Sequence, residues 1–293
     1  MKPKAITLIL SALCAGVASI SAQGGFVLFG EAGPALAPEQ KTVRPLTAPY
    51  FHEDSFVTTD FRAWWVRHHF YSDTIGGHAT VAALQVRVAI TQQLQLVAYK
   101  DGHTRFSGTM GGESGWNDVG AGLKWAFLQD WDRELHAAVG LGYELSLGDE
   151  AVLQNTQTLR LWGSVNKSFD RLHLGATANY LKANNRSAGA LGNADMLTGH
   201  LHADYFVNAW FSPVIEMNAY WVTNAGPVDA PFSGVDAVSI GGGKNEDTYT
   251  IAVGGEFRPF EDGLALRAAY ETQIFSSRSL FGHRWTLSAV FEF

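Results

Sequence analysis

The chain has 293 residues, which is enough for one sizeable domain, and only 17% of them are charged. Its 28 acidic side chains outnumber the 21 basic ones, which argues against nucleic acid as a partner, because phosphates attract basic faces. After residue 22 no apolar run is long enough for a transmembrane helix, so a helical membrane protein is excluded.

Residues 1–22 have the pattern of a secretory signal peptide. Lys2 and Lys4 form a short basic region, residues 5–20 are apolar, and Ala22 is one of the small residues that precede a cleavage site. The alternative is an uncleaved membrane anchor, for which the apolar stretch is short. We therefore expect Sec-type export.

Export changes what chemistry the mature chain can perform. Cys14 is the only cysteine and lies inside the signal, and Leu13 before it argues against a lipoprotein signal. The mature chain then has neither disulfides nor a thiol nucleophile. Loss of Lys2 and Lys4 leaves 19 basic against 28 acidic side chains, a formal charge of −9.

Residues 23–54 differ from the rest of the chain. They are rich in Gly, Ala and Pro and show no sustained period. We interpret them as a periplasmic lead-in segment or as a plug that enters the following domain.

From residue 55 onward, short segments alternate apolar residues with polar or small ones. In residues 134–147, Leu141 lies on the apolar parity and Gly140 on the other. Successive side chains of a strand point to opposite faces, so this pattern predicts a strand with one apolar and one wet side. We expect about twelve such strands, near residues 56–69, 78–90, 94–101, 118–127, 134–147, 159–166, 172–180, 197–207, 215–221, 247–257, 264–273 and 285–293.

The connections between these segments alternate in length. The short ones are residues 91–93, 129–133, 169–170, 208–212 and 259–263, and the longer ones are residues 72–77, 101–116, 148–155, 182–195, 224–246 and 276–282. An outer-membrane barrel has tight periplasmic turns and long outer loops. Aromatic residues near the short turns fit an interfacial girdle, and the chain ends on Phe293, through which we expect the last strand to meet the barrel-assembly machinery.

The polar face of these strands, here called the wet parity, carries too many charged residues to form a closed dry core, because buried unpaired charges are costly. Lipid outside and a polar lumen inside satisfies both faces, and a closed barrel pairs every strand edge. The sequence thus predicts an all-β protein, a transmembrane antiparallel up-and-down β-barrel over residues 55–293. The candidate lumen-lining residues are Asp60, Arg62, Trp64, Arg87, Asp118, Lys124, Glu144, Arg160, Trp162, His200, His202, Asp204, Glu216, Tyr220, Arg267 and Glu271.

Several stretches resemble a family of bacterial outer-membrane barrel proteins without an assigned function. They include residues 59–62, 76–78, 83–91, 100–102 and 116–124, and further matches lie at 234–236, 268–271 and 280–284. The run at residues 145–149 is distantly similar to the outer-membrane transporters of phenol meta-pathway degradation, although the usual Pro-Thr-Gly-Asp is replaced by Leu145-Ser146-Leu147-Gly148-Asp149. The resemblance implies a barrel in the outer membrane and brings no substrate.

Two kinds of chemistry remain as alternatives to transport. His200, His202 and Asp204 share the wet parity of one strand, but their spacing suits a hydrogen-bond network better than a metal ion, so we expect no metal and no cofactor. Barrel lipid hydrolases pair Ser with His, and this chain offers His136, His173 and His200 with Ser146, Ser164 and Ser288.

The sequence favours a passive channel or specific diffusion pore over an enzyme. About twelve strands imply a narrow lumen, and Trp64, Trp162, Phe206 and Tyr220 on the wet parity narrow it further. This mixture suits small, partly apolar solutes. The expected partners are outer-membrane lipid and such a solute, and the main rival is a non-conducting barrel that binds or serves a structural role.

Overall fold

The computed structural model describes residues 25–34, 36–73, 75–154, 156–184, 194–225, 243, 247–260, 263–275 and 280–293. Within these residues the helices are three 3-10 turns, and none is long and apolar enough to cross a membrane. The strands are β1 (Asp60–Phe70), β2 (His78–Ala89), β3 (Leu94–Lys100), β4 (His103–Ser107), β5 (Ser114–Trp116), β6 (Val119–Asp130), β7 (Leu135–Leu145), β8 (Thr158–Phe169), β9 (Leu172–Ala183), β10 (Asp195–Tyr205), β11 (Phe211–Asn224), β12 (Asp247–Phe257), β13 (Leu264–Gln273) and β14 (Phe281–Glu292).

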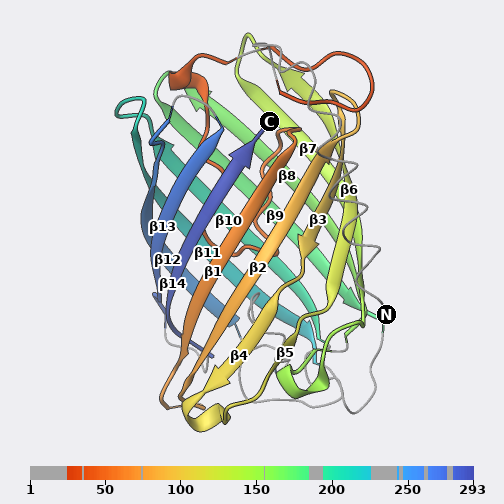
Figure 1. The fold of residues 1–293 in the computed structure, drawn as a ribbon, viewed down its shortest axis with the longest axis vertical. Helices are drawn as coiled ribbons and strands as arrows, with labels where there is room; N and C mark the ends of the chain where they lie inside the picture. Colours follow the sequence, from red (N-terminus) through yellow and green to blue (C-terminus); the bar gives the residue numbers. More distant parts are fainter. Residues whose placement is uncertain are drawn as a thin grey trace.

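The strands form one closed antiparallel barrel (Figure 1). From β6 to β14 each strand pairs with the next in sequence, β2 pairs with both β3 and β4, β3 pairs with β6, and β1 pairs with both β2 and β14 to close the wall. Strands β3 and β4 together occupy one position of the wall, as do β5 and β6, so the barrel has twelve positions. The predicted all-β, up-and-down barrel of about twelve strands is confirmed.

The alternation of the sequence becomes an inside and an outside. In β7, Leu141 is 56% exposed on the outer surface, whereas Gly140 is buried. The same alternation runs through the other long strands, with apolar side chains outward and polar or small ones inward. This places a polar lumen inside an apolar exterior, which is the inverse of a soluble barrel.

The strand ends that flank the short connections lie at one end of the barrel and those that flank the long connections at the other, as the sequence predicts. One predicted connection is wrong in detail, because residues 101–116 are not simply an outer loop. The wall is interrupted at Asp101 and Gly102 and again at Asn117 and Asp118, and β4 and β5 continue it beyond these breaks. Gly102 has a φ of +113°, which favours glycine, and its carbonyl accepts a hydrogen bond from the Asn117 N–H, while the Asp101 carboxylate accepts one from the Leu84 N–H. The alternation of apolar and polar residues in the sequence does not reveal this break.

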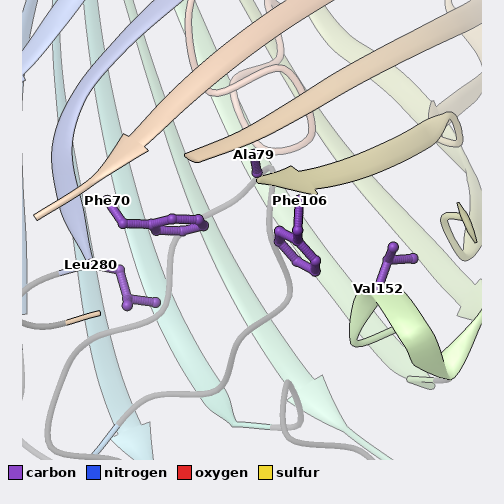
Figure 2. Packing of buried hydrophobic residues seen from close by; sticks show 5 residues of the cluster. All are labelled: Phe70, Ala79, Phe106, Val152 and Leu280. Carbon is purple, nitrogen blue, oxygen red and sulfur yellow. The ribbon is translucent and has the colours of Figure 1, made fainter. Parts of the chain in front are cut away.

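An apolar cluster lies inside the barrel at the end that carries the long connections (Figure 2). Phe70, Ala79 and Phe106 come from three neighbouring strands of the wall, while Val152 and Leu280 come from two connections. Ile75 and Leu153 pack against the cluster. We call these five buried residues the outer apolar cluster; they narrow the lumen at this end.

The inside–outside assignment predicts a large effect for Leu141→Arg. An arginine that faces lipid near the middle of the wall costs roughly 2–4 kcal/mol, whereas near the interface it costs about 0–1 kcal/mol. The matched control is Leu147→Arg, because Leu147 is 66% exposed just beyond the end of β7. Refolding yield into vesicles, followed by heat-modifiable gel mobility, should fall for Leu141→Arg and stay near wild type for Leu147→Arg.

From the sequence alone, Gly140→Arg would be an inward-facing control for the lipid-facing Leu141→Arg. The structure shows that it is not a suitable control. A Cβ at Gly140 would overlap the ring of Trp162 on the neighbouring strand. Any side chain at this position therefore damages packing in the lumen, and a failed Gly140 variant says nothing about lipid. Equal yields for the two leucine variants would contradict the assignment.

Candidate functional site: the lumen and its N-terminal segment

Residues 42–56, here called the lumen segment, lie within the barrel. The chain before and after this segment lies at the end with the short turns, where Phe26 N–H donates to the Phe293 carbonyl and Phe293 N–H donates to the Thr59 carbonyl. All residues of the lumen segment are buried except Phe51, which is half-buried. In Figure 1 this part of the chain is orange. The lumen segment therefore enters and leaves by the same end of the barrel.

Two carboxylates of the wall hold its first half through backbone N–H groups. Glu216 accepts hydrogen bonds from the N–H of Leu46 and of Thr47, at 2.8 and 2.7 Å, and also from the Thr47 hydroxyl. Asp204 accepts from the N–H of Val43 at 3.1 Å. His202 lies between the two carboxylates, 2.7 Å from Glu216 and 3.0 Å from Asp204. Hydrogen bonds to a charged acceptor are stronger than those between neutral groups, so Glu216 and Asp204 bind the backbone of the segment firmly.

Arg160 holds the turn of the lumen segment by its carbonyls. Its Nη1 and Nη2 donate to the carbonyls of Tyr50 and Phe51 at 2.6 and 2.9 Å. The guanidinium also lies 4.6 Å from the ring centroids of Tyr99 and Trp162. This arginine is fully buried, and its described partners are carbonyls, an amide and aromatic rings instead of the carboxylate that pairing across strands would lead one to expect.

Asp54 is the centre of a cluster of cations. Arg62, Lys124 and Arg44 place nitrogens 3.3, 3.5 and 3.6 Å from its carboxylate. Burial alone would raise the pKa of Asp54, but Arg44, Lys124 and Arg62 hold it well below its usual range. Next to it, Glu53 pairs with Arg87. The carboxylates of Asp54 and Glu53 are therefore held charged by Arg62, Arg87 and Lys124 of the wall and by Arg44 of the segment itself.

His52 adds a stacked contact to these charges. Its ring lies 5.2 Å from that of His200, with an angle of 24° between the planes. Burial lowers the pKa of His52 to about 3, so the imidazole is neutral at physiological pH. It contributes packing, not charge, to the hold on the segment.

The structure places all sixteen predicted lumen residues on the inner side of the wall, where each is buried. They divide into two groups. The residues that contact the lumen segment are Arg62, Arg87, Lys124, Arg160, Asp204, Glu216 and, through its ring stacked on His52, His200. The others bond mainly within the wall or its connections: Asp60 with Arg62, Trp64 with Gln85, Asp118 with Gly148 and Thr156, Glu144 with Lys100, Arg267 with Glu256, Glu271 with Arg284, His202 with Asp204 and Glu216, Tyr220 with the ring of His200 and Trp162 with Arg160.

Sequence reasoning missed several partners in this site. Asn166 and Asn179 share the inner parity of their strands and bond Ser55 and Phe51, and the alternation alone could have identified them. Glu53 and Asp54 had no such signal, because the segment that carries them has no period. Their partners become visible only when the chain is folded into the barrel.

The histidines considered for other chemistry have structural partners. His173 contacts Asp204 at 2.7 Å and the Glu39 carbonyl at 2.9 Å, and His136 packs between the rings of Phe56 and Trp131. In the described part of the chain, no group of three or more His, Cys, Asp or Glu residues has a geometry that could hold a metal ion. These contacts account for the histidines as parts of the lumen network.

Comparisons with known proteins support the fold. A scan of family models and a search of curated proteins find no match. Among solved structures, an outer membrane channel from Pseudomonas putida F1 superposes with a TM-score of 0.60 at 13% identity, over 86% of this chain and 100% of that chain. The KdgM porin matches 81% of this chain and 99% of its own with a TM-score of 0.45 and 12% identity, which is too low to carry an argument. The chain has the fold of an outer-membrane β-barrel.

Proposed function

We propose that this protein is a bacterial outer-membrane channel for small, partly apolar solutes, closed at rest by its own residues 42–56. It reaches the membrane by Sec-type export, and its apolar exterior meets the lipid. The fold shared with an outer-membrane channel of Pseudomonas putida F1 supports the location and the general role. The solute class rests on the lumen, which combines charged side chains with Trp64, Trp162 and Tyr220 and with the outer apolar cluster.

The observation that carries the proposal is the way in which the lumen is filled. A barrel of about eight strands fills its interior with wall side chains, whereas wider barrels leave space. Here that space holds a segment that enters from one end and is bound largely by hydrogen bonds and ion pairs. Water can replace such polar contacts when the segment moves aside, and a polar bore then remains.

The rival function is a barrel that binds or supports without conducting. The nearly complete burial of residues 42–56 favours this rival, because a segment so well satisfied has little reason to leave. The two functions agree on the resting state and differ in whether the closed lumen ever opens.

Planar-bilayer conductance separates them. We expect the mature protein to show rare, small openings, and a variant that lacks residues 42–56 to conduct steadily. A fully silent deletion variant that still shows heat-modifiable mobility would contradict the channel. Recovery of the mature chain in the soluble periplasm would contradict the location, and a mass change in added lipid would point to a hydrolase.

A further inference from the structure

A basic patch interrupts the apolar exterior near the end that carries the long connections. It lies on β14, β1, β2 and β4, which are neighbours in the wall (Figure 1). At this end of the barrel the outward-facing positions of these strands include histidines and arginines. Further along the wall, toward the short turns, the outward-facing positions are mainly Trp, Ala, Leu and Val. We call it the rim patch: Arg67, His69, His78, Arg105 and His283.

Strand register holds these residues together. His69 lies opposite His78 on one side and opposite His283 on the other, and Arg67 and Arg105 lie on either side of Thr80. The rings of His69 and His283 stack at 4.3 Å, and those of His69 and His78 lie 5.4 Å apart. The patch is thus continuous across four strands.

The contacts of Arg67 make the patch a source of hydrogen-bond donors. Its Nε lies 3.3 Å from His69 Nε2 and its Nη2 lies 3.2 Å from His78 Nε2. A guanidinium can only donate, so both imidazoles accept at Nε2 and carry their proton at Nδ1. The two neutral rings therefore add two N–H donors to the charge of Arg67.

The patch has a hollow and no anion of its own on the wall. A depression of about 400 Å³ is lined by His69, His78 and His283 together with Gly77 and Gly282. The outward positions of β14, β1, β2 and β4 include no Asp or Glu. The nearby Asp73, in the connection after β1, is exposed and accepts from the Ser72 hydroxyl at 3.3 Å. Arg67 and Arg105 thus concentrate positive charge on a chain that is acidic overall, which favours binding of an external anion at the rim patch.

The position of the patch indicates which anion. Trp285 lies opposite Arg67 and packs on Tyr270 with ring centroids 4.8 Å apart, and Trp65 lies on the outward parity below Arg67. Aromatic belts mark the headgroup level of a membrane, and long connections face the cell exterior. Acyl chains can pack along the apolar wall below while a headgroup reaches the hollow.

We propose that the rim patch binds the phosphate group of a phosphorylated lipid in the outer leaflet. This inference rests on the proposed membrane location but not on conduction. Arg67 supplies the charge, the histidines supply further donors, and Arg105 lies across Thr80 as a second cation. Arginine suits this role because its planar fork matches phosphate oxygens.

The test measures lipid binding by native mass spectrometry on the full mature chain in detergent micelles. The probes are bisphosphorylated lipid A and the same lipid with both phosphates removed. For Arg67→Gln combined with Arg105→Gln, we expect the concentration for half-occupancy by phosphorylated lipid A to rise about tenfold or more. The matched control is Arg133→Gln combined with Arg171→Gln, which removes the same charge from exposed positions beside the short turns. It should bind like the wild type.

Three outcomes would overturn the inference. They are equal binding by the two double variants, equal binding of the lipid without phosphates, and full displacement of lipid A by inorganic phosphate at the same concentration. Insertion into phosphatidylcholine vesicles is measured first. Failure of the wild type to insert defeats the proposed function, whereas insertion and conductance with no difference in lipid binding defeat only the rim patch.

Discussion

Arg160→Ala should open the barrel without unfolding it. The substitution removes both Arg160 donors, so the Tyr50 carbonyl loses a hydrogen bond and the Phe51 carbonyl keeps Asn179 Nδ2 at 3.0 Å. A hydrogen bond from a charged donor contributes about 1.5–3 kcal/mol, and Arg160→Ala removes this contribution only from the closed state, in which the segment stays in place. The balance therefore shifts toward the displaced segment, and we expect the open fraction in bilayers to rise by about tenfold or more, since roughly 1.4 kcal/mol is a factor of ten.

A second readout identifies the charge that was removed. Once the segment has moved aside, the bore has one fixed cation fewer, so reversal potentials across a salt gradient should shift toward cation preference. Arg267→Ala is the matched control. It removes another buried lumen arginine, but Arg267 pairs with Glu256 of the wall at 2.7 Å, and Glu256 keeps Arg258 at 2.6 Å. Its open fraction should stay low. Unchanged conductance for Arg160→Ala, with a lowered unfolding midpoint, would make the segment a permanent part of the fold.

Asp54→Asn should destabilise the folded protein most strongly. The change keeps the shape of the side chain and removes the charge among three cations. Arg62 retains Asp60 at 2.7 Å and Arg44 retains Glu292 at 3.1 Å, whereas within the described part of the chain Lys124 retains a hydrogen bond to the Asp54 carbonyl at 3.0 Å and the more distant charge of Glu53. A buried charge that loses its partner costs about 3–5 kcal/mol. The heat- or urea-denaturation midpoint should fall accordingly, while the exposed Asp73→Asn should leave it unchanged.

A double variant tests whether Lys124 causes this loss. Lys124→Met in the Asp54→Asn background removes the stranded cation, so most of the lost stability should return. If the double variant is as unstable as Asp54→Asn, the cost lies elsewhere in the segment, and the charge-cluster explanation fails.

The pKa of Asp54 also predicts how this contact depends on pH. A carboxyl whose pKa is lower in the folded protein contributes stability above its ordinary value of 3.8, and loses it only as the pH falls through the folded value. The difference between wild type and Asp54→Asn should therefore persist from neutral to mildly acidic pH. If the stability difference between wild type and Asp54→Asn vanished near pH 5, about one unit above the pKa of an aspartate in the unfolded chain, the cations would not be holding the carboxylate charged.

The barrel itself is encoded locally. Leu141 and Gly140 differ in parity, and that parity alone places one outward and one inward, because side chains of a strand alternate. The lengths of the connections identify the two ends of the barrel, because consecutive connections of an up-and-down barrel alternate between its ends. Short connections therefore gather at one end and long ones at the other. These features require no knowledge of which strand meets which, and the sequence predicts them correctly.

The interruptions of the wall show where local pattern is insufficient. Residues 101–116 lack a sustained alternation, so the sequence suggests a loop, although β4 and β5 lie within them. Their strand conformation comes from pairing with β2 and with each other beyond the break at Gly102. Pairing partners distant in sequence stabilise such short strands, and no window of the sequence contains them.

The lumen site divides in the same way. Parity by itself determined that Arg160, Glu216 and Lys124 face inward. What they bind was decided only by the tertiary structure, because residues 42–56 have no period and no motif that points to the wall. Their backbone groups carry much of the binding, and every sequence offers the same N–H and carbonyl groups. Only closure of the barrel around the segment turns those common groups into specific partners for Glu216 and Arg160.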